Sequence, residues 1–171
     1  NRGLSLDITD SEGNTPLHIA ARENHQEMCD YLIQNMCSLN ARNDRGESPL
    51  HISVKKNFVN LSLRLLEKGA SYEAITEDGF SVIMYAVLYN NLPIFQDAMR
   101  NYSIGFIDEH GRNYAHYATI TGNLPIIQYI AEQDKTLLEN GDFLKQSPFH
   151  FAAIYQRNKI IHYLFKQNIY P

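Results

Sequence analysis

Histidine is the first residue type in this chain to suggest a chemical role. Four of the seven histidines stand three residues after a Ser, Thr or Asn, and they are His18, His51, His116 and His150. Imidazole nitrogens are common zinc ligands, which makes a metal site one hypothesis. If the four histidines lie on equivalent helices that pack side by side, however, these helices lie roughly 8–10 Å apart. Zinc holds its ligand nitrogens at about 2 Å. The spacing therefore favours a structural role that recurs along the chain, in which each buried imidazole is hydrogen-bonded.

A second candidate is the stretch Asp108-Glu109-His110, which has the residue types of a general acid–base cluster. It falls at an expected hairpin tip, and the pattern puts no nucleophile beside it. No GxGxxG, P-loop, GxSxG or HExxH motif occurs in the chain. The sequence thus predicts a protein that is not an enzyme, with no cofactor and no metal site.

The four histidines belong to a phrase that recurs five times. It reads NTPLHIA at residues 14–20, and altered copies stand at 47–53, 80–86, 112–118 and 146–152. The second residue of every copy carries a hydroxyl or an amide, and successive copies are 33, 33, 32 and 34 residues apart. Recurrence at a nearly constant period of this length indicates a repeat architecture.

Each copy of the phrase should open a short helix. Thr15 can cap the helix with its hydroxyl, and Pro16 fits the first helical position because an N–H there has no intrahelical partner. In the third and fourth copies Val82 and Tyr114 replace the proline, so we expect these two helices to begin less sharply. Apolar residues at helical spacing follow each phrase, as in residues 61–66, and they predict a second, amphipathic helix.

The pattern D-x-x-G-x-T-P-L-H-x-A resembles the ankyrin-repeat family, and the likeness covers essentially the whole chain. Its best copy is carried by Asp10, Gly13, Thr15, Pro16, Leu17, His18 and Ala20. The resemblance implies an all-α fold, an ankyrin-repeat solenoid of about five stacked helix-turn-helix units joined by hairpin-like turns. It also implies that the histidine of the phrase forms a structural network with the hydroxyl at the helix start.

The repeats should form a single array over residues 1–171. The units run approximately over residues 10–42, 43–75, 76–107, 108–141 and 142–171, and residues 1–9 align with the tail of a preceding repeat. The last unit carries no obvious polar cap, so we expect a segment of a longer protein. Lys145 stands where a glycine is expected, which predicts a distorted last hairpin. Asn40 lies where asparagines of the family can be hydroxylated, although a turn-forming role is the favoured interpretation.

The composition narrows the class of partner and the cellular compartment. The net charge is −4, and no run of Lys and Arg occurs, which argues against nucleic-acid binding and against a membrane-surface role. No apolar stretch approaches the ~20 residues that cross a bilayer, so no direct membrane insertion is expected. Cys29 and Cys37 make no disulfide framework. We interpret them as reduced thiols of a cytoplasmic or nuclear protein.

The family resemblance also indicates where a partner would bind. In such stacks the hairpin tips and the outer sides of the first helices form a concave face, and other positions are committed to stacking. The first two units present only polar and charged residues there, Glu47 among them, whereas the last three present apolar and aromatic ones. Solvated positions of that kind indicate an interface, unless neighbouring side chains or other parts of the protein cover them. The predicted partner-binding residues are Arg45, Lys55, Lys56, Phe80, Leu88, Tyr89, Arg112, Ile120, Phe143, Leu144, Ile154 and Tyr155.

The predicted function is that of a non-catalytic protein–protein interaction module, an adaptor or scaffold. Its partner would be another protein or a peptide segment with apolar anchors and an acidic flank. The anchors would fit an apolar groove over the last three units, and the acidic flank would fit a basic shelf formed by Arg45, Lys55 and Lys56. One alternative is a regulatory ankyrin segment of a larger enzyme or membrane channel. A third hypothesis is a sensor that binds a small ligand or nucleotide in the same groove.

Overall fold

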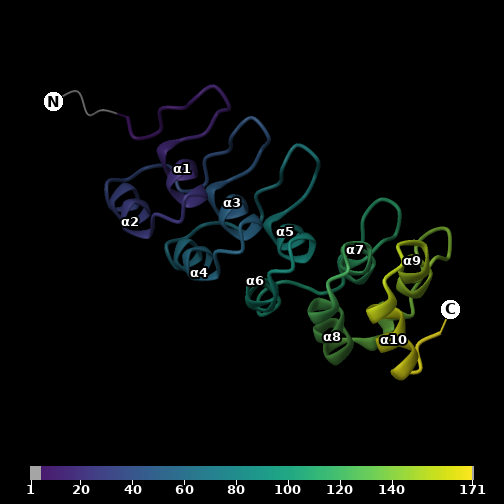
Figure 1. Cartoon of the computed structure of the whole chain (residues 1–171). Helices are drawn as coiled ribbons and strands as arrows, with labels where there is room; N and C mark the ends of the chain where they lie inside the picture. Colours follow the sequence, from purple (N-terminus) through teal and green to yellow (C-terminus); the bar gives the residue numbers. More distant parts are fainter. Residues whose placement is uncertain (1–4, 171) are drawn as a thin grey trace. The chain divides into compact units, whose positions relative to one another are not determined.

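The computed structural model describes residues 5–170, which form ten α-helices, one 3-10 helix and no β-strand (Figure 1). Each short helix opened by the recurring phrase is followed by a second helix. The prediction of an all-α fold built from helix-turn-helix units is therefore confirmed. The bounds are α1 Pro16–Arg22, α2 Gln26–Gln34, α3 Pro49–Lys55, α4 Val59–Glu67, α5 Val82–Leu88, α6 Leu92–Ala98, α7 Tyr114–Thr121, α8 Leu124–Gln133, η1 Lys135–Leu138, α9 Pro148–Ile154 and α10 Asn158–Lys166.

The chain divides into two compact parts, an N-terminal half (Asn1–Ile94) and a C-terminal half (Phe95–Pro171). In the N-terminal half α1 packs against α2 and α3, and α3 packs against α4 and α5. In the C-terminal half α7 packs against α8 and α9, α9 packs against α10, and η1 packs against α8. Within each half, first helices of successive repeats thus pack on one another, as expected for stacked repeats.

The apolar residues of the recurring phrase form the core of each repeat. Leu17 and Ala20 of α1 are buried, as is Leu50 of α3, and the second helix α4, which packs against α3, buries Leu61 and Leu65. One helix pair alone would leave this apolar stripe in water, so stacking stabilises the repeats. No helix within residues 5–170 is both long enough and apolar enough to cross a membrane.

The first helices begin equally sharply in all five repeats. Ser81 precedes α5 in an extended conformation (φ −77°, ψ 168°), and its Oγ accepts the Met84 N–H at 3.2 Å. Asn113 precedes α7 in a similar conformation (φ −98°, ψ 179°) and caps two amides with its Oδ1. The expectation that the helices starting at Val82 and Tyr114 begin less sharply is therefore wrong. The capping side chain fixes the start of these helices without help from a proline.

Hairpin tips of one geometry precede the first helices. In the first tip Asp10 donates its N–H to the Asn14 carbonyl at 3.0 Å and accepts the Gly13 N–H at 3.1 Å. The same pair of bonds closes residues 43–47, 76–80, 108–112 and 142–146. Within the N-terminal half, the Asp44 N–H donates to the Glu12 carbonyl at 3.1 Å, which joins successive tips. The prediction of hairpin-like turns between helix pairs is thus confirmed.

The last hairpin keeps this geometry although it lacks the glycine. Lys145 has a φ of 61°, in the left-handed region that Gly13 occupies with a φ of 74°. The Asp142 N–H donates to the Gln146 carbonyl at 3.0 Å, and the Lys145 N–H donates to the Asp142 carbonyl at 2.8 Å. The expectation of a distorted hairpin is therefore wrong. Lys145 instead adopts the glycine conformation, which costs an L-residue roughly 1–2 kcal/mol.

Replacing Lys145 with Gly should therefore stabilise the protein. Relief of the strain is partly offset by the larger backbone entropy of Gly in the unfolded chain, which leaves a gain of about 0.5–1 kcal/mol. Urea unfolding followed by circular dichroism measures this difference. Lys56→Gly is the matched control, because Lys56 has a φ of −82° and gains nothing from Gly. A lower free energy of unfolding in Lys145→Gly would contradict this account.

The residues before the first tip are described only in part. Residues 1–4 of the predicted tail of a preceding repeat lie outside the described residues. Asp7 accepts the Ser38 N–H with its carboxylate at 2.8 Å, and Asn40 accepts the Ser71 N–H with its amide oxygen at 2.9 Å. These two bonds are equivalent, one repeat apart. Asn40 therefore links consecutive turns, in agreement with the structural interpretation of this residue.

Candidate partner-binding surface

The recurring histidines tie each helix start to the hairpin of the next repeat. The Nδ1 of the fully buried His51 lies 3.1 Å from the backbone nitrogen of Ser48, and its Nε2 lies 3.3 Å from the carbonyl oxygen of Phe80. An amide N–H only donates and a carbonyl only accepts, so the ring is neutral with its proton on Nε2. His18 and His116 bond in the same way to their own helix starts and to the next hairpins.

These bonds occupy both ring nitrogens of His18, His51 and His116, so neither nitrogen of these three rings is free to ligate a metal. Burial lowers the pKa of His51 to about 4, and it also lowers the pKa of His18 and of His116, which favours the neutral rings. In the part of the chain that the structure describes, no three His, Cys, Asp or Glu side chains are grouped so that they could hold a metal ion. The periodic histidines thus have the structural role that their spacing favours.

Asp108, the first residue of the Asp108-Glu109-His110 stretch, also has a structural role. The Asp108 carboxylate accepts the Tyr117 hydroxyl at 2.6 Å and the Arg112 Nε at 2.8 Å, and it also accepts two backbone N–H groups of its own turn. Burial alone would raise the pKa of Asp108, but these hydrogen bonds outweigh it and lower the pKa to about 2. A carboxylate with this pKa does not exchange protons near neutral pH. Glu109 and His110 are exposed beside it.

Five of the six predicted partner-binding residues of the N-terminal half line one hollow. This hollow has a volume of about 290 Å³ and lies between the second and third tips and the C-terminal end of α5. A second hollow of about 380 Å³ lies over α1, α3 and the first two tips, and it takes in the sixth residue, Lys56. The two hollows share Arg45, Glu47 and Lys55. The predicted residues in the first hollow are Arg45, Lys55, Phe80, Leu88 and Tyr89.

A buried carboxylate organises the floor between these hollows. Glu47 is 5% exposed, and its Oε1 accepts the Lys55 ammonium and the Tyr85 hydroxyl, each at 3.0 Å. Burial alone would raise the pKa of Glu47, but the bonds from Lys55 and Tyr85 outweigh it and lower the pKa. The Lys55 ammonium also lies 5.9 Å from the ring centroid of Tyr89. The expectation that Glu47 is a free surface residue is therefore wrong.

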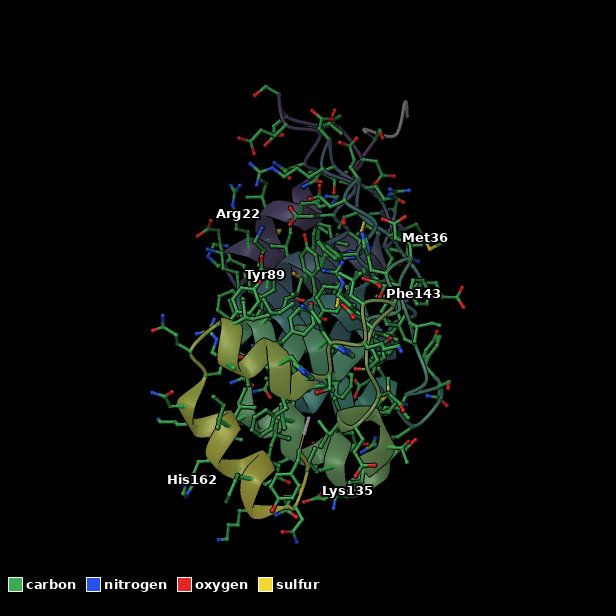
Figure 2. All side chains as sticks on the ribbon, turned by 90° about the vertical axis from the view of Figure 1, so that its right-hand side faces the viewer. Arg22, Met36, Tyr89, Lys135, Phe143 and His162 are labelled. Atoms are coloured by element: carbon green, nitrogen blue, oxygen red, sulfur yellow. The ribbon has the colours of Figure 1, made fainter. Side chains whose placement is uncertain are left out.

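This cluster changes which cations are free for a partner. Lys55 is half-buried and neutralised by Glu47, so it acts first as a support for the tyrosine rings. Arg45 and Lys56 are exposed, and within residues 5–170 neither side chain has a carboxylate partner. Tyr89 is 40% exposed and lies at the surface of this half (Figure 2). The exposed groups over the hollows thus include these two cations and one aromatic ring, together with the carboxylates of Glu12, Asp44, Glu77 and Asp78.

Four of the six predicted residues of the C-terminal half lie exposed, at two places. Phe143 and Leu144 lie exposed at the last hairpin tip, and Phe143 rests against the backbone of Gly111. Ile154 and Tyr155 lie exposed at the end of α9, where Tyr155 stacks on Phe151 with ring centroids 6.3 Å apart. The remaining two are held internally. Arg112 pairs with Asp108 at 2.8 Å and stacks on a tyrosine, and Ile120 is half-buried.

The structure adds residues that the sequence reasoning did not select. Glu47 and Tyr85 hold the floor of the hollows, and Arg22 and Asp44 extend their rim. A sequence signal existed for the first of these. Glu47 stands just before α3 and Lys55 eight residues later, a little over two helical turns, which brings both side chains to one side of the helix. Tyr85 carried no such signal, because its partner lies in the preceding repeat.

Comparison with known proteins agrees with this architecture. The family described as ankyrin repeats (3 copies) matches residues 2–76 and again residues 77–171. No curated protein matches the chain in sequence. Ankyrin repeats are generally modules for protein–protein interaction and are typically not enzymes. The two matches together cover nearly the whole chain, and so the chain belongs to the ankyrin-repeat family.

Proposed function

We propose that this chain is a non-catalytic adaptor or scaffold that binds a segment of another protein on its concave face. The observation that carries the proposal is the pair of adjoining hollows in the N-terminal half. An aromatic ring, Tyr89, and two unpaired cations, Arg45 and Lys56, are exposed over a floor fixed by the Glu47 cluster. Rigid aromatic anchors with free charges at their edge are typical of protein interfaces.

The chemistry of these groups also specifies the partner segment. An apolar side chain of the partner would contact Tyr89 and Leu88, and an acidic flank would pair with Arg45 and Lys56. Because Lys55 is already neutralised by Glu47, the acidic flank should depend on the other two cations. The exposed residues of the C-terminal half, Phe143, Leu144, Ile154 and Tyr155, offer further apolar anchors.

Replacing Tyr89 with Ala tests this surface. Peptides selected from a random displayed library on the wild-type chain should carry an apolar residue beside Asp or Glu. Their affinity for the Tyr89→Ala chain, measured by fluorescence anisotropy, should fall tenfold or more, because central aromatic anchors contribute about 2 kcal/mol or more. The free energy of unfolding should change by less than about 1 kcal/mol, since Tyr89 is a surface residue.

Tyr31→Ala is the matched control for this experiment. Tyr31 lies on the second helix α2 and is 60% exposed, and its loss should leave the affinity unchanged. Equal loss of affinity in both variants would overturn the proposed surface. A second result would also overturn the proposed surface. This is the selection of peptides that lack acidic residues and bind the Arg45→Glu, Lys56→Glu double variant as tightly as the wild type.

For the cellular location we propose the cytoplasm or the nucleus. Cys29 is buried and Cys37 is half-buried, and both are free thiols. Burial raises the pKa of Cys29 to about 11, so this thiol is poorly reactive. Free structural thiols of this kind are typical of reducing compartments.

A further inference from the structure

The outer surface of the C-terminal half carries a groove that the proposed function does not use. It lies between the second helices α8 and α10 and has a volume of about 590 Å³. We call it the outer groove, and its lining residues are Leu124, Asn158, Lys159, His162, Tyr163 and Lys166. This groove shares no lining residue with the hollows over α1, α3 and α5.

The sequence of α10 explains why cations gather in this groove. Ile160 and Leu164 are buried and fix the inward face of the helix. Lys159, His162 and Lys166 are spaced by three and four residues, so they share the opposite face. All three are exposed, and Figure 2 shows His162 projecting outward from α10. The outward face of this helix is therefore a stripe of basic residues two turns long.

The walls of the outer groove are mainly apolar, and its edge is basic. Most of the exposed wall is carbon, which Leu124 and Tyr163 supply together with the stems of the lysines. No carboxylate lines the groove, and within the described residues neither Lys159 nor Lys166 is paired with one. Burial raises the pKa of Tyr163, and the negative charge of Glu132 adds to this effect. This local excess of positive charge stands out in a chain with a net charge of −4.

We infer that the outer groove is a second docking site, which binds an acidic peptide segment of a partner through one apolar side chain. The apolar anchor would rest on Leu124 and Tyr163, and acidic residues on either side of it would pair with Lys159 and Lys166. Charge complementarity identifies this occupant, because a basic or neutral segment would leave two exposed cations unpaired. The site gives the protein a second binding surface, which lies on second helices and is built from other residues than the first.

The charge reversal Lys159→Glu, Lys166→Glu tests this docking site. The probe is a short fluorescein-labelled peptide of glutamates with a central phenylalanine, and anisotropy measures its dissociation constant. Reversal should weaken binding by roughly tenfold or more, since it replaces two attractive charge pairs with repulsive ones. Binding to the wild type should also weaken as salt rises. A probe with Ser in place of Phe should bind less tightly, because the apolar wall then has no partner.

The matched variant is Arg45→Glu, Lys56→Glu, which makes the same change in net charge on the concave surface. The probe also has the chemistry proposed for the concave surface, so the charge reversal is measured in this background, which leaves the outer groove as the binding site. No binding in the concave variant, or no further loss when Lys159→Glu, Lys166→Glu is added to it, would overturn the outer groove without removing the proposed function. No binding of the probe would also overturn it. Binding to phosphatidylserine vesicles but not to the peptide would assign the groove to a membrane surface instead. Circular dichroism of both variants checks that the exposed changes leave the fold intact.

Discussion

Replacing His51 with Ala should remove about 3–4 kcal/mol of the free energy of unfolding near neutral pH. The substitution leaves the Ser48 N–H without its acceptor and the Phe80 carbonyl without its donor. Both bonds are buried or partly buried, and each unsatisfied group costs about 1–3 kcal/mol. The lost ring also leaves a cavity against the edge-on Tyr85. Urea unfolding followed by circular dichroism measures the loss.

The free energy of unfolding of His51→Ala should depend less on pH than that of the wild type does. In the folded protein the pKa of His51 is about 4, whereas the ordinary value is 6.5. Between these values the unfolded chain binds a proton that the folded chain does not, so stability falls as the pH falls from 6.5 towards 4. The share of His51 over this window is roughly 3 kcal/mol, because each pKa unit corresponds to about 1.4 kcal/mol. His18 and His116 act in the same direction, so a smaller slope remains in the variant.

The exposed His162 supplies the control for the loss of stability. His162→Ala should keep the wild-type stability, because His162 lies exposed on the outer face of α10. Measurements between about pH 7 and about pH 5 avoid most carboxyl titration. Equal pH slopes in the wild type and in His51→Ala would show that the buried imidazole does not couple proton binding to unfolding.

The fold could be predicted from the sequence because its signals are local. Thr15 and Ser48 mark helix starts, and a glycine marks the turn before each of them, so the period can be read without long-range information. Two expectations about the fold were wrong, the less sharp helix starts and the distorted last hairpin. Each of them treated a single residue, the proline of the helix start or the glycine of the turn, as essential. Ser81 starts its helix without a proline. Lys145 closes its turn without a glycine, because the carboxylate and carbonyl of Asp142 hold the turn.

The surface was harder to predict, because its charges pair across repeats. Glu47 looked exposed in the pattern, but Tyr85 of the following repeat covers it and bonds to it at 3.0 Å. That contact spans 38 residues, and no short-range spacing rule reaches so far. Because the buried Glu47 pairs with Lys55 and neutralises it, Lys55 is no longer a free cation of the basic shelf. Arg45 and Lys56 kept their expected exposure because neither takes part in this cluster.

Replacing Gly46 with Ala should destabilise the N-terminal half by about 2–4 kcal/mol. Gly46 has a φ of 72°, and a Cβ there would lie 2.8 Å from the backbone nitrogen of Glu77 and 2.9 Å from the Cα of Thr76. Backbone atoms cannot rotate away as a side chain can. The tip must therefore shift, which strains the bond from the Glu77 N–H to the Arg45 carbonyl, now 3.0 Å long. Urea unfolding of the variant gives the loss.

Gly79→Ala separates the two causes of this loss. Gly79 occupies the same place in the next hairpin with a φ of 81°, but a Cβ there would meet nothing within 4 Å. Its substitution should cost only the backbone strain, about 1–2 kcal/mol. The difference between the two variants then measures how tightly successive hairpins are packed. Equal losses would mean that the contact between the second and third tips yields freely, and that the tips do not hold the floor of the binding surface in place.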